Sequence, residues 1–341
     1  MITNNGRFKN MKIVLIDPAC NFLYSSFYIR GLLDLFGKRS VCFSSIPFAG
    51  LTYTSHTHIF AFVINGKKYA IDFADSNQIF YDEFLHWADI YAKVNYNSKY
   101  IPTAYAQKIV RCGCNYGMAI YPNRWLAIIV AIKNWVLCHR RVQFSFKSYL
   151  SRYIMSVKRQ SQSTQKSTER NDYIFFVSTL WKGQDKCNQA RINFIRACHN
   201  LQSEGLITFE GGLIPDVQQD VKEIEDVLLQ KRIPFDEYTE KLSQSCCVFN
   251  TPAYFDCHGW KLAEYMAMGK IILSTPFVNE LPKGMIDKKH ILFCDDSVTS
   301  VQAAIRSLIL DGSLREKIKQ GISEYYMDYA CPEEVIKQII L

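Results

Sequence analysis

Short apolar runs alternate with segments of helical period along most of the chain, and this alternation predicts an α/β protein. Residues 12–17 form an apolar run that ends in a polar loop, which is typical of a buried strand, and residues 28–36 are typical of a helix. Residues 59–64 and 67–73 are joined by Asn-Gly, which favours a tight hairpin turn. The N-terminal half should therefore be α/β with some antiparallel pairing.

The alternation is most regular after residue 172. Five strand-like runs are expected, at 173–177, 206–209, 245–250, 271–274 and 291–294. Helical segments separate or follow them, at 187–201, 217–229, 259–268, 298–310 and 314–325. Gly211-Gly212 is expected to end the second of these strands. A βαβ series of this kind predicts a parallel, doubly wound sheet, which places ligands at the carboxyl ends of its strands.

The positive charge is concentrated in one segment. The net charge is +8, yet residues 124–170 contain ten Lys or Arg and a single acid, which leaves the rest of the chain near −1. The Ser-, Gln- and Thr-rich end of this segment, residues 156–171, is typical of a linker. We expect an N-terminal α/β domain at 1–165, a C-terminal Rossmann-like domain at 172–325 and a final helix at 326–341 that packs back on the first domain.

Composition narrows the class of protein. With 48% hydrophobic and 21% charged residues, the chain is neither disordered nor collagen-like. Its twelve cysteines include no pair of Cys-x-x-Cys units, so we interpret them as reduced residues of a cytoplasmic protein without a metal site. The start is polar, and the longest apolar run, at 125–132, is far shorter than the roughly 20 residues that a membrane span needs.

The segment from Asn250 to Pro276 contains the candidate chemistry. A strand is expected to end near Asn250, and a helix to begin near Gly259, so that the helix N-terminus lies at the carboxyl edge of the sheet. Unpaired N–H groups at such an end attract anions. Lys261 adds a cation in the first turn, and Glu264 can accept hydrogen bonds from ribose hydroxyls. The pattern predicts a site for a nucleoside diphosphate.

Residues 256–269 resemble a known family, the retaining GT-B glycosyltransferases of family 4. Their signature is Glu, seven residues, Glu, then Ala-Met-Ala-x-Gly-x-Pro, and here Asp256 replaces the first Glu while Glu264 and Gly269 match. Phe209-Glu-Gly-Gly212, Lys182-Gly183 and Glu280 add to the resemblance, which covers about residues 173–296. Trp260-Lys261 and Tyr265 are most similar to enzymes of bacterial surface-polysaccharide clusters.

The resemblance implies a GT-B fold, with two Rossmann-like domains and a donor cleft between them. It implies that Asp256 contacts the donor sugar and that Lys182 neutralises the leaving phosphate. Donor binding is further assigned to Glu264, Gly259, Lys261, Trp260, His258 and Glu280. The resemblance implies no metal and no other cofactor. The family usually has an Arg shortly before the Lys, and here Lys261 or Arg191 are the candidates that could replace it.

The basic segment at 124–170 has several open interpretations. Aromatic residues such as Trp125 and Trp135 are interleaved with its cations, as in segments that bind an anionic membrane surface. A core helix with a solvated basic face would give the same composition. Nucleic acid is the weaker option because no recognised nucleic-acid module surrounds the segment. A cytoplasmic protein, either free or peripheral on the inner face of the membrane, fits this composition.

The expected function is transfer of a sugar from a nucleotide-diphosphate-sugar donor to a saccharide or lipid-linked saccharide, with retention, in bacterial surface-polysaccharide synthesis. Two alternatives stay open. A GT-B relative could epimerise or hydrolyse nucleotide sugars, and a non-enzymatic basic adaptor could bind a membrane or nucleic acid.

Overall fold

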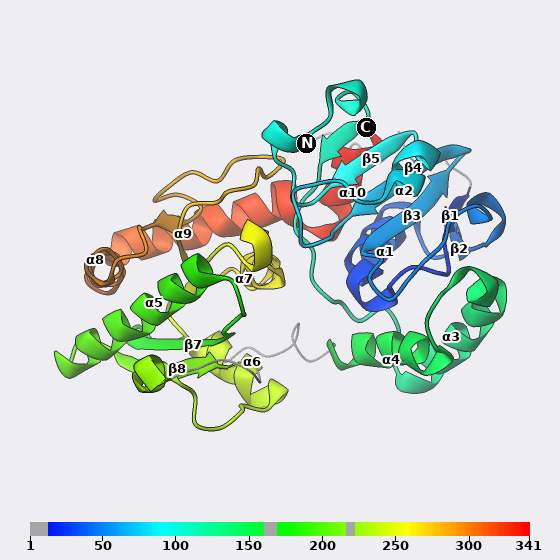
Figure 1. Cartoon of the computed structure of the whole chain (residues 1–341). Coiled ribbons are helices and arrows are strands. Elements are labelled where there is room, and N and C mark those ends of the chain that lie inside the picture. Colours follow the sequence, from blue (N-terminus) through cyan, green and yellow to red (C-terminus); the bar gives the residue numbers. More distant parts are fainter. Residues whose placement is uncertain (1–12, 160–168, 216–221) are drawn as a thin grey trace. The chain divides into compact units, whose positions relative to one another are not determined.

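The computed structural model describes residues 13–159, 169–215 and 222–341. They form two compact units, each with its own hydrophobic core. The first unit comprises residues 13–159, 280–282 and 329–341, and the second comprises the other described residues between 169 and 328 (Figure 1). Both units combine helices with a β-sheet, so the α/β prediction is confirmed.

The first unit is built on a six-stranded mixed sheet of order β2-β1-β3-β4-β5-β6. Its strands are β1 (Val14–Ile16), β2 (Val41–Phe43), β3 (Ile59–Ile64), β4 (Lys67–Asp72), β5 (Ile90–Lys93) and β6 (Ile109–Arg111). Its α-helices are α1 (Phe22–Phe36), α2 (Asp82–Trp87), α3 (Arg124–Cys138), α4 (Phe146–Val157) and α10 (Pro332–Ile340). The predicted hairpin is confirmed: β3 and β4 pair antiparallel through the Asn65-Gly66 turn, and the other pairs except β1–β3 are parallel.

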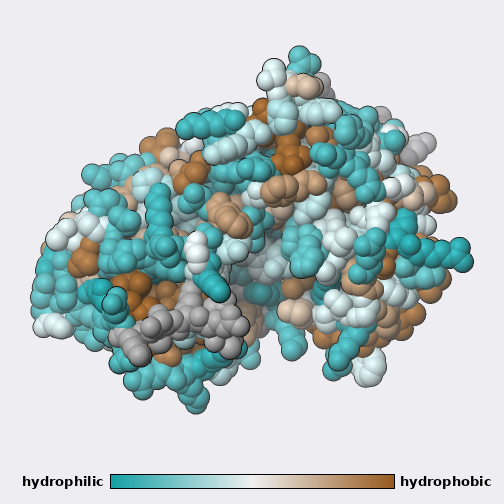
Figure 2. Space-filling view, viewed as in Figure 1, coloured by the Kyte–Doolittle hydropathy of each residue, from teal (hydrophilic) through white to brown (hydrophobic). Residues whose placement is uncertain are grey.

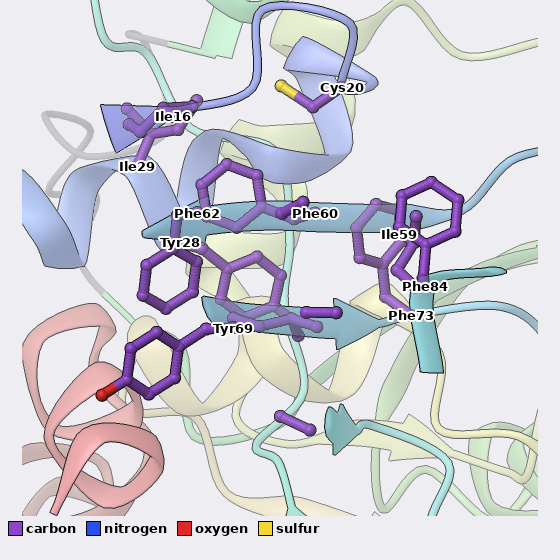
Figure 3. Packing of buried hydrophobic residues seen from close by; sticks show 14 of the residues in the cluster. Ile16, Cys20, Tyr28, Ile29, Ile59, Phe60, Phe62, Tyr69, Phe73 and Phe84 are labelled. Carbon is purple, nitrogen blue, oxygen red and sulfur yellow. The ribbon is translucent and has the colours of Figure 1, made fainter. Parts of the chain in front are cut away.

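The core of this unit is rich in aromatic rings. All six residues of β3 are buried, which agrees with its uninterrupted apolar sequence in the middle of the sheet. Tyr28 of α1 stacks on Phe60 at a ring-centroid distance of 5.9 Å, and Phe62 stacks on Tyr69 at 4.9 Å (Figure 3). Helix α1 is thereby fixed on the sheet by ring-to-ring contacts across one face of the β3–β4 hairpin.

The C-terminal helix α10 belongs to the first unit and lies against α1. Its residues Val335, Ile336 and Ile339 are buried. The approach of the two helices is close at Gly31, where an added Cβ would lie 2.1 Å from the carbonyl oxygen of Pro332. A residue larger than glycine at this position would therefore force the two helices apart.

Helices α3 and α4 form a pair anchored to the end of β1. Arg141, between the two helices, donates from Nη2 to Asp17 Oδ1 at 2.6 Å and from Nη1 to Oδ2 at 3.0 Å, and the Asp17 carboxylate is fully buried. Tyr149 donates its hydroxyl to the carbonyl of Pro18 at 2.7 Å. Burial raises the pKa of Asp17, while Arg141 lowers it. Because an unpaired charge in this place would be costly, removal of either partner would destabilise the other.

The second unit has two parallel sheets, β7–β8 and β9–β10–β11. Its strands are β7 (Tyr173–Thr179), β8 (Thr208–Ile214), β9 (Val248–Asn250), β10 (Ile272–Ser274) and β11 (Leu292–Phe293). Its α-helices are α5 (Asp185–Ser203), α6 (Phe235–Gln244), α7 (Trp260–Ala267), α8 (Val298–Leu310) and α9 (Gly312–Tyr325). Every strand pair is parallel, in agreement with the βαβ prediction.

Ser245 connects the two sheets. Phe175 of β7 donates its N–H to Ser245 Oγ at 2.9 Å, and the N–H of Cys246 donates to the carbonyl of Tyr173 at 2.8 Å. Strand β7 therefore lies next to β9, and the combined order is β8-β7-β9-β10-β11. This is a Rossmann-like core, whose strand order reverses between β7 and β9, and such a reversal marks the usual ligand site of a parallel sheet.

Two local predictions in this unit are corrected. Gly211 and Gly212 do not end β8 but lie inside it, paired with Phe176 and Val177. An added Cβ at Gly211 would lie 1.9 Å from the carbonyl oxygen of Phe176, so the glycine permits close approach of β7. The helix predicted at 217–229 lies partly outside the described residues, and at Lys222–Val227 the structure has a 3-10 helix with a non-helical residue, Ile224.

No helix in the described ranges combines the length and hydropathy of a membrane span.

Gly31→Ala tests the packing of α10 on α1. Alanine is the better helix former by about 1 kcal/mol, so propensity alone predicts stabilisation. Because the new methyl group would collide with the backbone at Pro332, we expect instead a loss of about 1–3 kcal/mol or more in the free energy of unfolding. Urea denaturation measures it, with Gly50→Ala as control because a Cβ there meets nothing within 4 Å. A stabilised Gly31→Ala variant would contradict the close approach.

Candidate functional site

A pocket of about 320 Å³ lies in the second unit, at the carboxyl ends of its strands. It is next to β7 and β9, between which the strand order reverses. It is formed by the ends of β7, β8 and β9, the start of α7 and one residue of α5. The lining residues are Phe176, Val177, Ser178, Thr179, Trp181, Arg191, Ile214, Phe249, Asn250, Thr251, Ala253, Gly259, Trp260 and Lys261. The position is the one that strand topology alone predicts for a ligand.

The start of α7 forms one wall of the pocket. Gly259 is its N-cap residue and Trp260 its first residue, as the sequence predicts within one position. The first N–H groups of a helix have no partner inside the helix, and they give this end a partial positive charge. At Gly259 an added Cβ would lie 3.3 Å from the Cβ of Ala253, so the glycine allows the loop at Ala253 to lie close to the start of the helix. Together these features form a wall that favours an anion.

Lys261 is the cation of this wall. Its Nζ donates to the carbonyl of Val177 at the end of β7 and lies 5.4 Å from the centroid of the Phe176 ring. Burial and, to a smaller extent, the neighbouring Arg191 lower the pKa of Lys261 to about 7, while the charge of Glu264 opposes both effects. The amine is therefore poised between its two protonation states near neutral pH, and an anion in the pocket would favour the charged form.

Arg191 of α5 provides a second cation. It is 5% exposed, its Nη1 donates to the carbonyl of Thr179, and its guanidinium lies 4.5 Å from the centroid of the Trp181 ring. Burial lowers the pKa of Arg191, but an arginine remains charged at any pH the protein meets. Two cations from different helices thus meet at the end of β7 and line the same pocket.

Glu264 follows Lys261 by three residues on α7, and it is buried at 8% exposed. It does not line the pocket in this structure. Its charge raises the pKa of Lys261, which means that the carboxylate lies within electrostatic range of that amine. Carboxylates at the spacing of Asp256 and Glu264 occur on many helices, where they face solvent. Glu264 differs from these because it is buried.

The loop before α7 is strained. Phe255 and Asp256 both have positive φ, +50° and +59°, a conformation that is costly for non-glycine residues and often found at functional sites. Phe255 N–H donates to Gln184 Oε1 at 3.0 Å, and Asn279 Nδ2 donates to the carbonyl of Asp256 at 3.1 Å. These bonds from two other segments hold the strained turn in place and leave the Asp256 side chain exposed.

His258 is buried beside this loop, with its ring 5.3 Å from that of Phe277 in an edge-on contact. Burial lowers the pKa of His258 to about 4, although a hydrogen bond with the Asn279 backbone raises it. The imidazole is therefore neutral at pH 7 and unsuited to act as an acid there. It does not line the pocket.

The remaining predicted residues lie outside the pocket lining. Lys182 is exposed in the turn between β7 and α5. Glu280 belongs to the first unit, where its carboxylate accepts the N–H of Ser98 at 3.0 Å and pairs with Arg111 at 2.6 Å. These bonds lower the pKa of Glu280 and occupy both of its oxygens. Of the eight predicted residues, the structure brings Gly259, Trp260 and Lys261 together at the pocket.

Sequence reasoning missed Trp181 and considered Arg191 only as a replacement. The signal was present in the sequence: an i, i+4 apolar pattern places Arg191 on the inner face of α5, and eight other residues of this helix are buried. A charged residue in such a position needs a polar partner, and here it finds a strand-end carbonyl and an aromatic face.

No model of a protein family matches the chain, and no curated protein matches its sequence. Some solved structures resemble it. The C-terminal domain of a glycosyl transferase group 1 family protein (LpcC) from Francisella tularensis is 16% identical with a TM-score of 0.35, and the match covers 50% of this chain and 91% of that one. A glycosyltransferase from Rickettsia africae is 12% identical with a TM-score of 0.40, covering 76% of this chain and 66% of that one.

A UDP-GlcNAc 2-epimerase from Neisseria meningitidis, bound to UDP-GlcNAc, is also 12% identical, with a TM-score of 0.38 and coverage of 75% and 62%. The chain spans less than two thirds of the Rickettsia and Neisseria chains. At these identities and scores the likeness concerns the α/β fold and carries no assignment of activity, so function is inferred from the pocket residues.

Lys261→Met tests the lowered pKa of this amine. The unfolded chain binds the Lys261 proton up to about pH 10, whereas the folded protein releases it near pH 7. Because the unfolded state then holds more protons, wild-type stability should rise relative to that of Lys261→Met between about pH 7 and pH 9.5. Scanning calorimetry across this range measures the difference. The exposed Lys317→Met on α9 should show no such trend, and a pH-independent difference for Lys261→Met would contradict the lowered pKa.

Proposed function

We propose that the protein is a glycosyltransferase that moves a sugar from a nucleotide-diphosphate-sugar donor to an acceptor. The observation that carries the proposal is the pocket at the β7–β9 reversal, where the start of α7, Lys261 and Arg191 converge. A helix end, the buried Arg191 and the partly buried Lys261 favour a ligand with at least two negative charges, and a diphosphate has this chemistry. The signature from Asp256 to Gly269 supports the same assignment.

In this proposal the diphosphate lies against the Gly259 backbone, with Lys261 and Arg191 as its cations. Both side chains donate to carbonyls of β7. A diphosphate supplies acceptors of greater charge, so one or both cations would turn from these carbonyls to the phosphate oxygens. Arg191 then takes the part of the arginine that the family usually has shortly before Lys182.

The donor's other parts are assigned by position along α7 and its preceding loop. Glu264 would accept hydrogen bonds from the ribose, and Trp260 would line the path of the donor. Asp256, held by a strained turn and exposed, would contact the sugar hydroxyls, with His258 supporting the loop as a neutral residue. Glu280, whose carboxylate is bound to Ser98 and Arg111, would meet the donor only by giving up one of these partners.

Catalysis in this proposal depends on the stabilisation of the leaving diphosphate. As the glycosidic bond to the phosphate breaks, negative charge grows on the phosphate oxygen. Fixed cations in a pocket that excludes water stabilise that charge better than water does. Lys261, Arg191 and the α7 N–H groups would supply this stabilisation without a metal, and Lys182 would join them from the β7–α5 turn. Retention of configuration, a saccharide or lipid-linked acceptor and a role in bacterial surface polysaccharide complete the proposal.

Nucleotide binding tests the pocket directly. We expect calorimetry with UDP, GDP and ADP to find one diphosphate that binds, and Lys261→Met to weaken it at least about tenfold through loss of a charge-assisted contact. Because binding should favour protonated Lys261, wild type should take up a proton at about pH 8, seen as a dependence of the heat on the buffer's ionisation enthalpy.

The matched control is Lys317→Met, which removes an exposed lysine of α9 and should bind as wild type does. Equal affinity of Lys261→Met and wild type for every nucleotide that binds would remove Lys261 from the site. Binding of none of the three by wild type would overturn the proposed donor site.

Asp256→Asn separates donor chemistry from nucleotide binding. The amide keeps the size of the side chain but accepts fewer hydrogen bonds, so affinity for the nucleoside diphosphate should stay within about twofold while turnover of the cognate nucleotide sugar falls by about 100-fold. Products are resolved by chromatography with and without an acceptor. Unchanged turnover would reject the role of Asp256, and conversion of donor to an epimer or free sugar without acceptor would identify an epimerase or hydrolase instead.

A further inference from the structure

Helix α3 presents its large apolar side chains to solvent. Trp125, Ile129, Ile132 and Val136 are 75%, 63%, 48% and 66% exposed. Their spacing of four, three and four residues places them in one stripe along the helix. We refer to these four residues as the α3 stripe. Figure 2 shows hydrophobic residues on the surface at the lower right of the view, where Figure 1 places α3.

The opposite face of the helix is small or polar. Its buried residues are Ala127, Ala131, Asn134 and Cys138. Asn134 donates from Nδ2 to the hydroxyl of the buried Tyr153 at 3.1 Å, so this face is held by a hydrogen bond as well as by packing. A helix that folds only to fill a core buries its largest apolar residues. Helix α3 instead exposes its largest apolar residues, and a contiguous exposed apolar stripe of this kind indicates a site that binds a protein or a membrane.

The charged residues of α3 and of the segment that follows it are all basic. No acidic residue occurs between residues 124 and 168. Arg124 and Lys133 flank the stripe on either side of the helix, and Arg140 and Lys147 follow its end, all four exposed. Arg141 is not one of these cations, because its guanidinium is bound to the buried Asp17.

We propose that the α3 stripe inserts into the interface of an anionic lipid bilayer, with the surrounding cations on the lipid headgroups. An apolar stripe with tryptophan at one end and a cationic rim is the composition that such an interface selects. Helix α3 has fifteen residues, fewer than the roughly 20 of a span, so it lies along the surface.

Other occupants fit the stripe less well. A symmetric dimer through α3 would bring the same cationic rim from both copies together. A nucleic acid needs cations at the centre of its contact, whereas here the centre is aliphatic. An anionic bilayer satisfies the apolar centre and the basic rim together. The proposal is independent of the nucleotide pocket, because every residue it uses belongs to the first unit and its test contains no nucleotide.

Co-sedimentation of the full chain with vesicles tests the proposal. Wild type should bind vesicles of phosphatidylcholine with phosphatidylglycerol and not vesicles of phosphatidylcholine alone. A stripe variant with Trp125→Gln, Ile129→Gln and Val136→Gln should bind at least about tenfold more weakly, since glutamine keeps the helix but does not enter the interface. A control with Ile46→Gln and Leu310→Gln removes exposed apolar residues elsewhere and should bind as wild type does.

A charge variant separates the rim from the stripe. Replacement of Arg124, Lys133 and Arg140 by Gln should weaken binding on the order of a hundredfold at low salt. Replacement of Lys38, Arg39 and Lys67, which are exposed elsewhere in the first unit, changes net charge equally and should weaken it much less. If the two charge variants weakened binding equally, the attraction would depend on net charge and not on the cations around the α3 stripe, which would overturn the proposal.

Tryptophan quenching locates the contact. Brominated lipid should quench fluorescence of the wild type, and Trp125→Phe should bind equally but lose most of that quenching, although four other tryptophans remain. Absence of wild-type binding, equal binding to both vesicle types, or wild-type binding by the stripe variant would each overturn the proposal. So would a dimer in light scattering that the stripe variant abolishes without any binding to vesicles, because the stripe would then cover a second copy.

Discussion

Two cations, the buried Arg191 and the partly buried Lys261, complete the carboxyl end of β7. A parallel strand that ends at a sheet edge leaves carbonyl groups with no ladder partner, and each such group in a dry place costs free energy unless a donor reaches it. Lys261 from α7 and Arg191 from α5 supply those donors to Val177 and Thr179. The same bonds fix the two helices relative to the strand and gather positive charge where the pocket opens, so the fold and the proposed chemistry depend on one arrangement.

This arrangement explains why the pocket needs a ligand to be at its most stable. Burial lowers the pKa of both cations, which means that the folded protein holds them at a cost. An anion that enters the pocket removes part of this cost and restores the charged form of Lys261. Functional sites often keep such unfavourable groups, because their stabilisation by the substrate contributes to binding.

Regular patterns in the sequence predict the elements, and long-range contacts decide the rest. The Asn65-Gly66 hairpin and the start of α7 are predictable because their signals are local: a turn dipeptide and a helix-opening glycine. The placement of Gly211 inside β8 was missed because a glycine that permits close strand approach has the same sequence signal as one that ends a strand. The partners of Glu280 could not be predicted, since Ser98 and Arg111 are about 170 to 180 residues away in sequence.

The candidate site shows the same division. The sequence places Gly259, Lys261 and Glu264 at the start of one helix, and the structure confirms this helix. Gly259 and Lys261 line the pocket, whereas Glu264 is buried and does not line it. The contribution of Arg191 depends on α5 lying against β7, which no local pattern specifies. Likewise, composition located the positive charge at 124–170 but could not separate Arg141, which is used inside the fold, from Arg124 and Lys133, which face solvent.

The molecule therefore has two kinds of positive charge with different physical roles. The cations around the α3 stripe are exposed, so dissolved salt screens them and their attraction reaches only about 8–10 Å at physiological ionic strength. Arg191 is buried and Lys261 partly buried at the ends of β7 and β9, where dissolved salt screens a charge less than it does on the exposed surface. Four of the ten cations of residues 124–170 are of the first kind, namely Arg124, Lys133, Arg140 and Lys147. A chain of the same net charge with its cations spread evenly would lack the exposed rim, yet it could retain the pocket, because two placed residues are enough there.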